Sequence, residues 1–456
     1  MTPPPGDDIP PMGVVVSNID PSEPAHVLIE KKDADGWVIV SNGTFTVEPR
    51  SSVTTRLARR AITGSEISAG GAYRITSNRP VTAYQINPHV SVGAYHSKGS
   101  SRDASLLLPV SAYGDTYIVP AWPYGPPSGS AGVEKAHVQI VAHAQTEVRV
   151  TSPVDGETGS TVPSLRAGET TTFCLQAGDY LQLTVKNAMD SFNGLSIEAN
   201  HPVGVFSSND CSNVPALWDA PACDHLEEQV LPVSSWGKEY ALARVPQREG
   251  DWSDGYPPGL DGSVAIWQIM ARDDDTTIHF NAAEDVRGLP ESVALNAKEM
   301  VQYEVTGPPL HPGDFYVAAD KPISVMQYMV GTMYDDLPGY ALGDPSMVLW
   351  PPIERLRDSY VIDVPWGCNY NFLALVRERG TALSIDGLPV DATWSPVGTS
   401  SFEAARVRVM PGVHDVTGKG PFGVTVVGYD TFVSYAFPGG IADVPGPPGP
   451  PGHPPR

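Results

Sequence analysis

Apolar and polar side chains alternate in short segments along most of the chain. Such alternation occurs in residues 137–142 (HVQIVA), 146–150 (TEVRV), 265–271 (AIWQIMA), 300–305 (MVQYEV) and 422–429 (FGVTVVGY). The segments are rich in β-branched and aromatic residues, and Gly, Pro, Asn or Asp bound them. This period of two predicts β-strands. Because proline recurs so often, long helices are excluded, and only IERLRD (353–358) predicts a short helical piece.

A proline-marked pattern recurs along the chain. The residues around Pro80, Pro202 and Pro322 read AGGAYRITSNRPVTAYQ, NGLSIEANHPVGVFSS and PGDFYVAADKPISVMQY, and a shortened version surrounds Pro421. Each has an alternating segment, a polar turn and then the proline. Recurrence at a near-constant offset is the signature of a repeated supersecondary unit. We therefore predict that these prolines occupy equivalent structural environments.

A second recurring pattern, a proline with a tyrosine eight positions later, follows the first proline pattern along the chain. Three further prolines each precede a tyrosine by eight positions: Pro109 and Tyr117, Pro232 and Tyr240, Pro352 and Tyr360. The copies are expected at about 26–136, 137–264, 265–370 and 371–440, within one repeated β module at 13–440. The Pro-rich ends at 1–12 and 441–456 are expected to be spacers, the second one a polyproline-like tail.

About seven short strands per copy fit two all-β architectures of internally repeated antiparallel units. The favoured one is a propeller-like closed ring, and the alternative is a row of tandem immunoglobulin-like β-sandwiches. The two ends of the chain favour the ring. The segment GVVVSN (13–18) stands before the first copy in the same way that YVIDVP (360–365) stands before the fourth. End-to-end closure would pair both segments and remove exposed sheet edges.

The charge balance limits the possible partners. The chain has 52 acidic and 29 basic residues and a formal charge of −23, so nucleic acid and anionic membrane surfaces would be repelled. No apolar run is long enough for a spanning helix, and the start MTPPPGDDIPP lacks the features of a signal peptide. The chain is thus expected to bind no nucleic acid and to insert in no membrane.

Two of the four cysteines lie close together in the sequence, Cys211 and Cys223. A disulfide between them would stabilise the folded state by roughly 3 kcal/mol, because it restricts the unfolded chain. The other interpretation is two free thiols. Spacing does not decide whether Cys174 and Cys368 pair. The loop between Cys211 and Cys223 carries Trp218 and Asp219, which are candidate binding residues because binding side chains concentrate on loops of rigid scaffolds.

The stretch CDHLEE that starts at Cys223 resembles a metal or acid–base centre, with Asp224 and His225 as the candidate binding residues. In the other copies, the positions of its histidine and glutamates are assigned to Ala104, Leu106 and Leu107, or to Ser346, Val348 and Leu349. The stretch is therefore interpreted mainly as scaffold whose charged side chains face solvent, with a ligand-contacting surface or a catalytic site as the alternatives.

Motifs for catalysis and for cofactors or metals are not found. The sequence has no G-x-S-x-G, H-E-x-x-H or Walker motif, so neither an enzyme nor a cofactor is expected. Two acidic runs, 251–262 and 272–277, resemble loose calcium loops, but the second fits a plain β-turn better. No metal site is predicted.

Several motifs together resemble one known family. PVGVFSSND (202–210), CDHLEEQVLPVSSWGKEY (223–240), AGE (167–169) and GYDTFVSYAFPGG (428–440) are similar to segments of the IgGFc-binding protein N-terminal domain family. The resemblance is best over residues 137–440. It implies an extracellular or cell-surface binding or adhesion module without enzymatic activity, and it does not by itself imply antibody binding.

Three possible functions follow. The first is an extracellular module, attached to the cell surface or secreted, that presents loops on a rigid β framework to a protein or glycan ligand. The alternatives are a secreted, glycosidase-like hydrolase with carboxylates in a central cleft and a structural component of a surface appendage.

Overall fold

The structure is a computed structural model, and it describes residues 12–58, 62, 64–87, 102–123, 135–216, 223–246, 248, 264–308, 310–332, 334 and 342–442. These residues form antiparallel β-strands and three short 3-10 helices, and none of them lies in an α-helix. The predicted all-β class is confirmed, and each of the alternating segments predicted as strands lies in one.

Unit 2 shows the repeated topology in full. It consists of β9 (Gly114–Val119), β10 (Ala136–Ala142), β11 (Thr146–Thr151), β12 (Thr170–Leu175), β13 (Tyr180–Thr184), β14 (Leu195–Ser212) and β15 (Asp224–Gln229). The long strand β14 changes partners along its length. Its first part lies between β9 and β11, and its second part lies between β10 and β15. The register shift falls between Glu198 and Val203, at Pro202.

Units 3 and 4 repeat this arrangement. Unit 3 consists of β16 (Gly237–Leu242), β17 (Ala265–Ala271), β18 (Thr276–Ala282), β19 (Ser292–Leu295), β20 (Met300–Val305), β21 (Phe315–Met329) and β22 (Ser346–Trp350). Unit 4 consists of β23 (Arg357–Val364), β24 (Tyr370–Glu378), β25 (Leu383–Ile385), β26 (Leu388–Pro389), β27 (Ser395–Pro396), β28 (Phe402–Val409), β29 (Gly412–Asp430) and β30 (Val433–Pro438). The long strands β21 and β29 take the place of β14.

Unit 1 is divided into two sheets. One has the order β4-β1-β7-β8 and the other the order β3-β2-β6. Its strands are β1 (Met12–Asn18), β2 (Ala25–Asp33), β3 (Gly36–Val47), β4 (Ser52–Leu57), β6 (Tyr73–Ser77), β7 (Val81–Asn87) and β8 (Asp103–Leu107), while β5 (Glu66–Ser68) joins the sheet of unit 2. Strands β6 and β7 correspond to the two parts of β14, with Pro80 between them.

The pairing of β1 corrects one sequence interpretation. β1 pairs with β4 and β7 as β10 pairs with β13 and β14, so the segment GVVVSN corresponds to the second strand of a unit. YVIDVP lies instead in and just after β23, the first strand of unit 4. Both segments are short and apolar, and only their non-local pairing distinguishes them. The copy boundaries given above remain a prediction.

The two sequence markers meet at the bend of each long strand. The tyrosine hydroxyl of the first strand donates a hydrogen bond to the carbonyl that follows the bend proline, from Tyr117 to Val203 (2.6 Å), Tyr240 to Ile323 (2.5 Å) and Tyr360 to Phe422 (2.5 Å). The same hydroxyls accept backbone N–H bonds from Gly114, Gly237 and Arg357. The predicted equivalence is thus confirmed for Pro202, Pro322 and Pro421; Pro80 lies at the corresponding place between β6 and β7, without such a tyrosine contact among the described residues.

The second set of prolines begins the links between units. Pro109, Pro232 and Pro352 stand directly before η1 (Val110–Ala112), η2 (Val233–Ser235) and η3 (Ile353–Arg355), in extended conformation. The helical piece expected at IERLRD is η3, a single 3-10 turn. Each link leads from the last strand of one unit to the first strand of the next.

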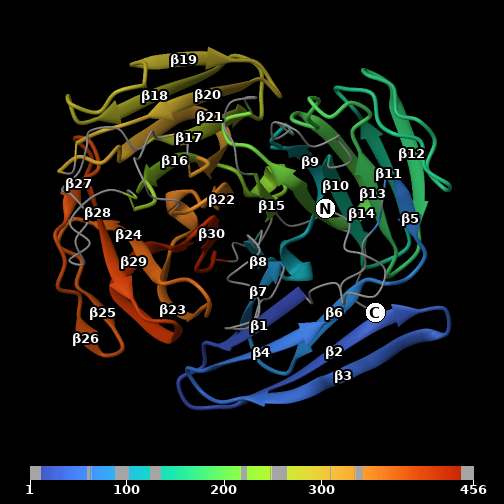
Figure 1. The fold of residues 1–456 in the computed structure, drawn as a ribbon, viewed down its shortest axis with the longest axis horizontal. Helices are drawn as coiled ribbons and strands as arrows, with labels where there is room; N and C mark the ends of the chain where they lie inside the picture. Colours follow the sequence, from blue (N-terminus) through green and yellow to red (C-terminus); the bar gives the residue numbers. More distant parts are fainter. Residues whose placement is uncertain are drawn as a thin grey trace, which may run out of the picture.

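The four units form a closed ring, with their last strands at the centre (Figure 1). β8 contacts β15, β15 contacts β22, β22 contacts β30, and β30 contacts β8. Closure joins the first and last units, because the Tyr84 hydroxyl lies 3.0 Å from the carbonyl of Val361 and 3.1 Å from that of Gly439. The favoured closed ring is confirmed.

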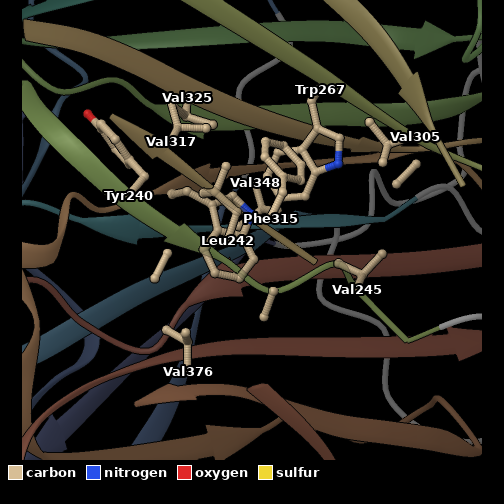
Figure 2. Close-up of a cluster of buried hydrophobic side chains, with 14 of the residues drawn as sticks. Tyr240, Leu242, Val245, Trp267, Val305, Phe315, Val317, Val325, Val348 and Val376 are labelled. Carbon is tan, nitrogen blue, oxygen red and sulfur yellow. The ribbon is translucent and has the colours of Figure 1, made fainter. Parts of the chain in front are cut away.

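Hydrophobic clusters fill the curled sheets of the units, and the cluster of unit 3 continues into unit 4 through Phe372, Val376 and Ala404. In unit 3, side chains from both parts of the curled sheet pack around Trp267, whose ring centroid lies 5.0 Å from that of Phe315 (Figure 2). The equivalent cluster in unit 2 draws on both parts of β14 and on the four strands β10 to β13. A unit therefore resembles the small two-layer sandwich of the alternative architecture, while the whole chain closes as a ring.

Candidate functional site

A disulfide joins Cys211 at the end of β14 to Cys223 just before β15, with a Cα–Cα distance of 5.1 Å. The disulfide predicted from the sequence is confirmed. Trp218 and Asp219, which the closed loop carries, lie outside the described residues, so their role in binding stays a prediction. Cys174 and Cys368 are free thiols, the first exposed and the second buried.

The charged stretch after the disulfide is buried at the centre of the ring. All six residues of β15, Asp224–Gln229, are buried, and His225 is the most exposed of them at 7%. The interpretation that these side chains face solvent is therefore wrong. Their burial is a result of ring closure, because β8 and β22 contact β15 from neighbouring units.

Strand register also corrects the alignment of this stretch. Phe206 pairs with Gln229 and Tyr84 pairs with Leu106, and both Phe206 and Tyr84 lie four residues after a bend proline. The residue of unit 1 that corresponds to Glu228 is therefore Ser105, and Leu107 is not its equivalent.

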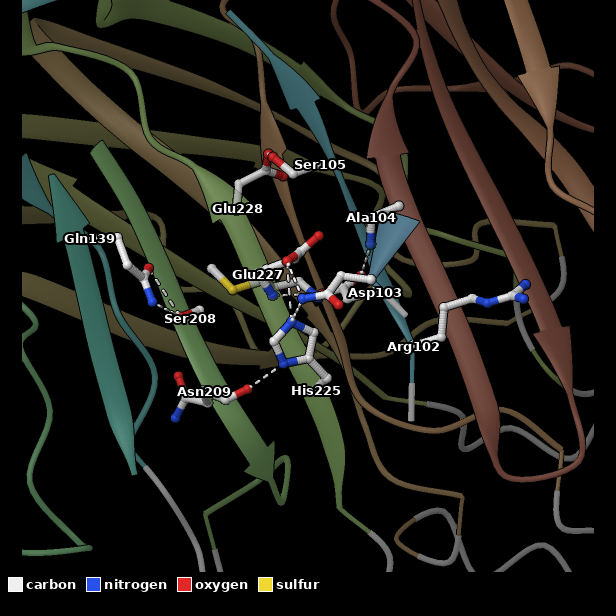
Figure 3. Close-up of polar contacts among 12 residues, drawn as sticks. Arg102, Asp103, Ala104, Ser105, Gln139, Ser208, Asn209, His225, Glu227 and Glu228 are labelled. Atoms are coloured by element: carbon white, nitrogen blue, oxygen red, sulfur yellow. Dashed lines mark hydrogen bonds and ion pairs between the residues drawn. The ribbon is translucent and has the colours of Figure 1, made fainter. Parts of the chain in front are cut away.

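Asp224 and His225 contact other groups of the protein, and Figure 3 shows the contacts of His225. The Asp224 Oδ1 atom accepts backbone N–H bonds from Arg102 and His225, both at 2.7 Å. Imidazole Nδ1 of His225 lies 2.8 Å from the Asn209 carbonyl oxygen, so it donates there, and Nε2 lies 3.2 Å from Glu227 Oε2. Both side chains hold β15 against its neighbours, and a direct contact with a ligand stays a prediction.

A second carboxyl of this centre, Asp103 in β8, connects three units (Figure 3). Its Oδ2 atom accepts backbone N–H bonds from Glu227 in unit 2 (3.1 Å) and Met347 in unit 3 (3.2 Å). Its Oδ1 atom accepts from the Ser346 hydroxyl at 2.7 Å and from the Ala104 N–H at 3.0 Å. Asp103 is fully buried.

Glu228 also connects units 1, 2 and 3 through hydrogen bonds to its carboxyl oxygens. Its Oε1 accepts from the Ser105 hydroxyl (2.8 Å) and its Oε2 accepts from the Leu349 N–H (3.0 Å). The N–H of Gln229 donates to Ser105 Oγ, and the side-chain Oε1 of Gln229 accepts from the Leu108 N–H, both at 2.8 Å. We call Asp103, Ser105, Glu228 and Gln229 the central hub.

Burial governs the ionisation of the hub carboxyls. It raises the pKa of Asp103 well above its usual range and that of Glu228 to about 8, while hydrogen bonds from Ser346 and Leu349, respectively, act in the opposite direction. A glycosidase needs two carboxyls that face a substrate. The hub carboxyls are instead buried and taken up by intramolecular donors, so their evident task is to hold units 1, 2 and 3 together.

Carboxylates also border a groove of about 690 Å³ between units 3 and 4. Its lining combines apolar side chains with the exposed Glu239, Glu354 and Glu378. In the described residues, no group of three or more His, Cys, Asp and Glu side chains is placed to hold a metal ion. The acidic run 272–277 forms the turn between β17 and β18 and the start of β18, and 251–262 lies outside the described residues.

An exposed tryptophan lies beside the base of the disulfide loop. Trp366, in the turn between β23 and β24, is 62% exposed. Its carbonyl accepts a hydrogen bond from Arg102 Nη1 at 3.1 Å, and the backbone N–H of the buried Arg102 binds Asp224, which directly follows Cys223. Units 4, 1 and 2 therefore meet here. The Pro-Trp-Gly sequence at 365–367 was the signal for this residue, because it places an aromatic in a turn.

Comparison with known proteins agrees with this architecture. A family model described as "IgGFc binding protein" matches residues 103–428, from β8 into β29. The human IgGFc-binding protein is 26% identical over 352 residues, which are 76% of this chain and 6% of the human protein. The chain belongs to the IgGFc-binding protein family. It spans only a small part of the curated relative that it matches. No helix within the described residues has the length and hydropathy to cross a membrane.

Proposed function

We propose that the chain is an extracellular recognition module that binds a protein or glycan, without enzymatic activity, through the surface formed by the disulfide loop and the Trp366 turn. Family membership supports a binding role, and the disulfide is typical of extracellular proteins. The acidic charge disfavours nucleic acid as the ligand.

The observation that carries this proposal is the position of Trp366. Its side chain is exposed, yet the turn that bears it is fixed by the buried Arg102, which also binds the base of the disulfide loop through Asp224. Aromatic side chains on a rigid base are frequent anchors of interfaces. In this proposal, Trp218 and Asp219 contact the ligand, and Asp224 and His225 position the loop.

The test is a binding screen with the chain of residues 1–456 against glycan and protein arrays. The Fc fragment of IgG belongs among the probes, because the human relative is named for binding it. For any probe that binds, Trp366→Ala is expected to weaken binding at least tenfold, since loss of a hot-spot tryptophan costs about 2 kcal/mol or more. Its thermal midpoint should stay unchanged, because the side chain is exposed.

Met410→Ala is the matched control, because Met410 is also strongly exposed in unit 4. Reduction of the disulfide should weaken binding in the same way as Trp366→Ala. Equal binding by the wild type, both variants and the reduced protein would place the recognition surface elsewhere and contradict the proposal.

A further inference from the structure

The first strand of the repeat is missing from unit 1 in the described part of the chain. In units 2, 3 and 4, strands β9, β16 and β23 pair with the first part of the long strand. The corresponding strand of unit 1 is β6, and it is the edge of the sheet β3-β2-β6, with β2 as its partner. The edge of β6 therefore occupies a position that another strand covers in every other unit.

The core of unit 1 is incomplete at this edge. The residue five positions before the bend proline pairs with the tyrosine of the first strand: Ile197 with Tyr117, Val317 with Tyr240 and Val416 with Tyr360. All three aliphatic residues are fully buried. Ile75 occupies the same position before Pro80 and is only half-buried. The difference is what an absent covering strand would produce.

The link after unit 1 provides a second, independent observation. A Cβ atom on Gly114 would lie 2.3 Å from Pro232, and one on Gly237 would lie 2.2 Å from Pro352, so the first strand of a unit packs on the link that follows that unit. Pro232 and Pro352 are buried, but Pro109 is exposed.

The apolar residue after each of these prolines follows the same trend. Val233 and Ile353 are half-buried, whereas Val110 is 49% exposed. Both η1 and β6 thus expose surface on the two sides of a single missing strand.

Alternate residues of β6 direct their backbone N–H and C=O groups to the edge where a further strand could pair. Lys32 donates to the Ala72 carbonyl and Asn78 donates to the His26 carbonyl, so alternate residues from Ala72 to Asn78 turn their backbone groups towards β2. Tyr73, Ile75 and Ser77 therefore direct their N–H and C=O groups away from β2, towards the edge.

We propose that the edge formed by β6 and η1 binds an extended segment of a partner protein other than this chain, which adds to the sheet as an antiparallel strand. The three native first strands define the chemistry of that segment: GDTYIV, GKEYAL and RDSYVI, in which a tyrosine precedes apolar residues. Its tyrosine lies opposite Ile75 and donates to the carbonyl of Val81, the residue that follows Pro80. Addition of a strand to a sheet edge is an established mode of peptide recognition.

Residues 1–11 are poor candidates for the missing strand. They include five prolines, at positions 3, 4, 5, 10 and 11, and proline lacks the N–H that a ladder requires. A segment from another chain has no such restriction.

The test uses a fluorescein-labelled peptide of residues 236–245 (WGKEYALARV), which carries the first strand of unit 3. Saturable binding to the chain is expected, measured by fluorescence anisotropy, together with slower hydrogen exchange in β6, Tyr73–Ser77. Val110→Arg should weaken binding at least tenfold. Leu388→Arg, at a more exposed apolar position in unit 4, is the control and should bind as the wild type does. A peptide with Pro in place of Tyr240 should not bind.

Three outcomes would overturn the proposal. The first is no saturable binding, as expected if residues of the chain itself already cover β6. The second is binding that Val110→Arg leaves unchanged, with exchange protection outside β6. The third is a dimer of the chain, dispersed by Val110→Arg, in which β6 is protected without peptide; the occupant would then be a second copy. Trp366→Ala should leave peptide binding unchanged, so this test does not depend on the proposed ligand surface.

Discussion

Replacement of Asp103 tests whether the central hub holds the ring together. In the wild type its carboxyl oxygens accept backbone N–H bonds from Glu227 and Met347 of two other units. In Asp103→Ala, these two buried donors and the N–H of Ala104 lose their acceptor, and each unsatisfied donor costs about 1–3 kcal/mol. The free energy of unfolding should therefore fall by about 3–9 kcal/mol.

Asp103→Asn should give an intermediate result. An asparagine can keep its oxygen towards Glu227 and Met347, while its amide group faces Ser346, whose hydroxyl can rotate to accept a hydrogen bond. The N–H of Ala104 then loses its acceptor. We expect a loss of about 1–3 kcal/mol, smaller than that of the alanine variant.

Urea denaturation followed by tryptophan fluorescence measures these losses, with reversibility checked by refolding. Asp115→Ala is the matched control, because Asp115 is an exposed aspartate at the start of β9. Hydrogen exchange of β15 and β22 should accelerate in Asp103→Ala, since both strands donate to its carboxyl. If Asp103→Ala costs no more than Asp115→Ala, the hub does not stabilise the ring and the reasoning fails.

Two further predictions concern the links and the pH dependence. Gly237→Ala should destabilise the protein by about 1–3 kcal/mol in a thermal melt, because the new methyl group overlaps Pro352. Gly420→Ala is the control and should be tolerated, because the nearest neighbour of its methyl group would be 3.7 Å away. Burial raises the pKa of Glu228 from 4.5 to about 8, so the folded chain retains a proton that the unfolded chain releases, and stability should fall as the pH rises through this window. Glu228→Gln should make urea midpoints less dependent on pH between about 4.5 and 8; an unchanged slope would contradict this assignment.

The strands and the repeat could be predicted from the sequence because both depend on local patterns. Alternation gives the strands, and the spacing from Pro232 to Tyr240 is preserved because the tyrosine hydroxyl must reach the carbonyl at the bend of the long strand. The Cys211–Cys223 disulfide also follows from short spacing. Each of these features is set by residues that lie close together in the chain or by one repeated contact.

The burial of the charged stretch could not be predicted in this way. DHLEEQ is polar at most positions, which is typical of an exposed strand. Its partners Asp103, Ser105 and Leu349 are more than 100 residues away, in units 1 and 3. Only closure of the ring brings them together. The same limit explains why the sequence predicts that GVVVSN is equivalent to YVIDVP, whereas the pairing of β1 with β4 and β7 shows otherwise.

Ring closure by the last strands explains why charged residues occur in unit 2. Each of these strands pairs along one edge with the long strand of its own unit, and its other edge faces neighbours with which it forms no ladder. The N–H groups of Leu349, Met347 and Gln229 on those edges belong to the backbone, so no substitution can remove them.

A purely apolar centre would leave these donors unsatisfied. This differs from a buried ion pair, in which apolar side chains can replace both partners at little cost. Acceptors must instead come from side chains, and Asp103, Ser105, Glu228 and Gln229 supply them from units 1 and 2. Units 1 and 2 therefore carry polar side chains at positions where unit 3 has Ser346, Val348 and Leu349. Four copies that all carried the apolar Val348 and Leu349 of unit 3 at these positions would bury unpaired backbone groups.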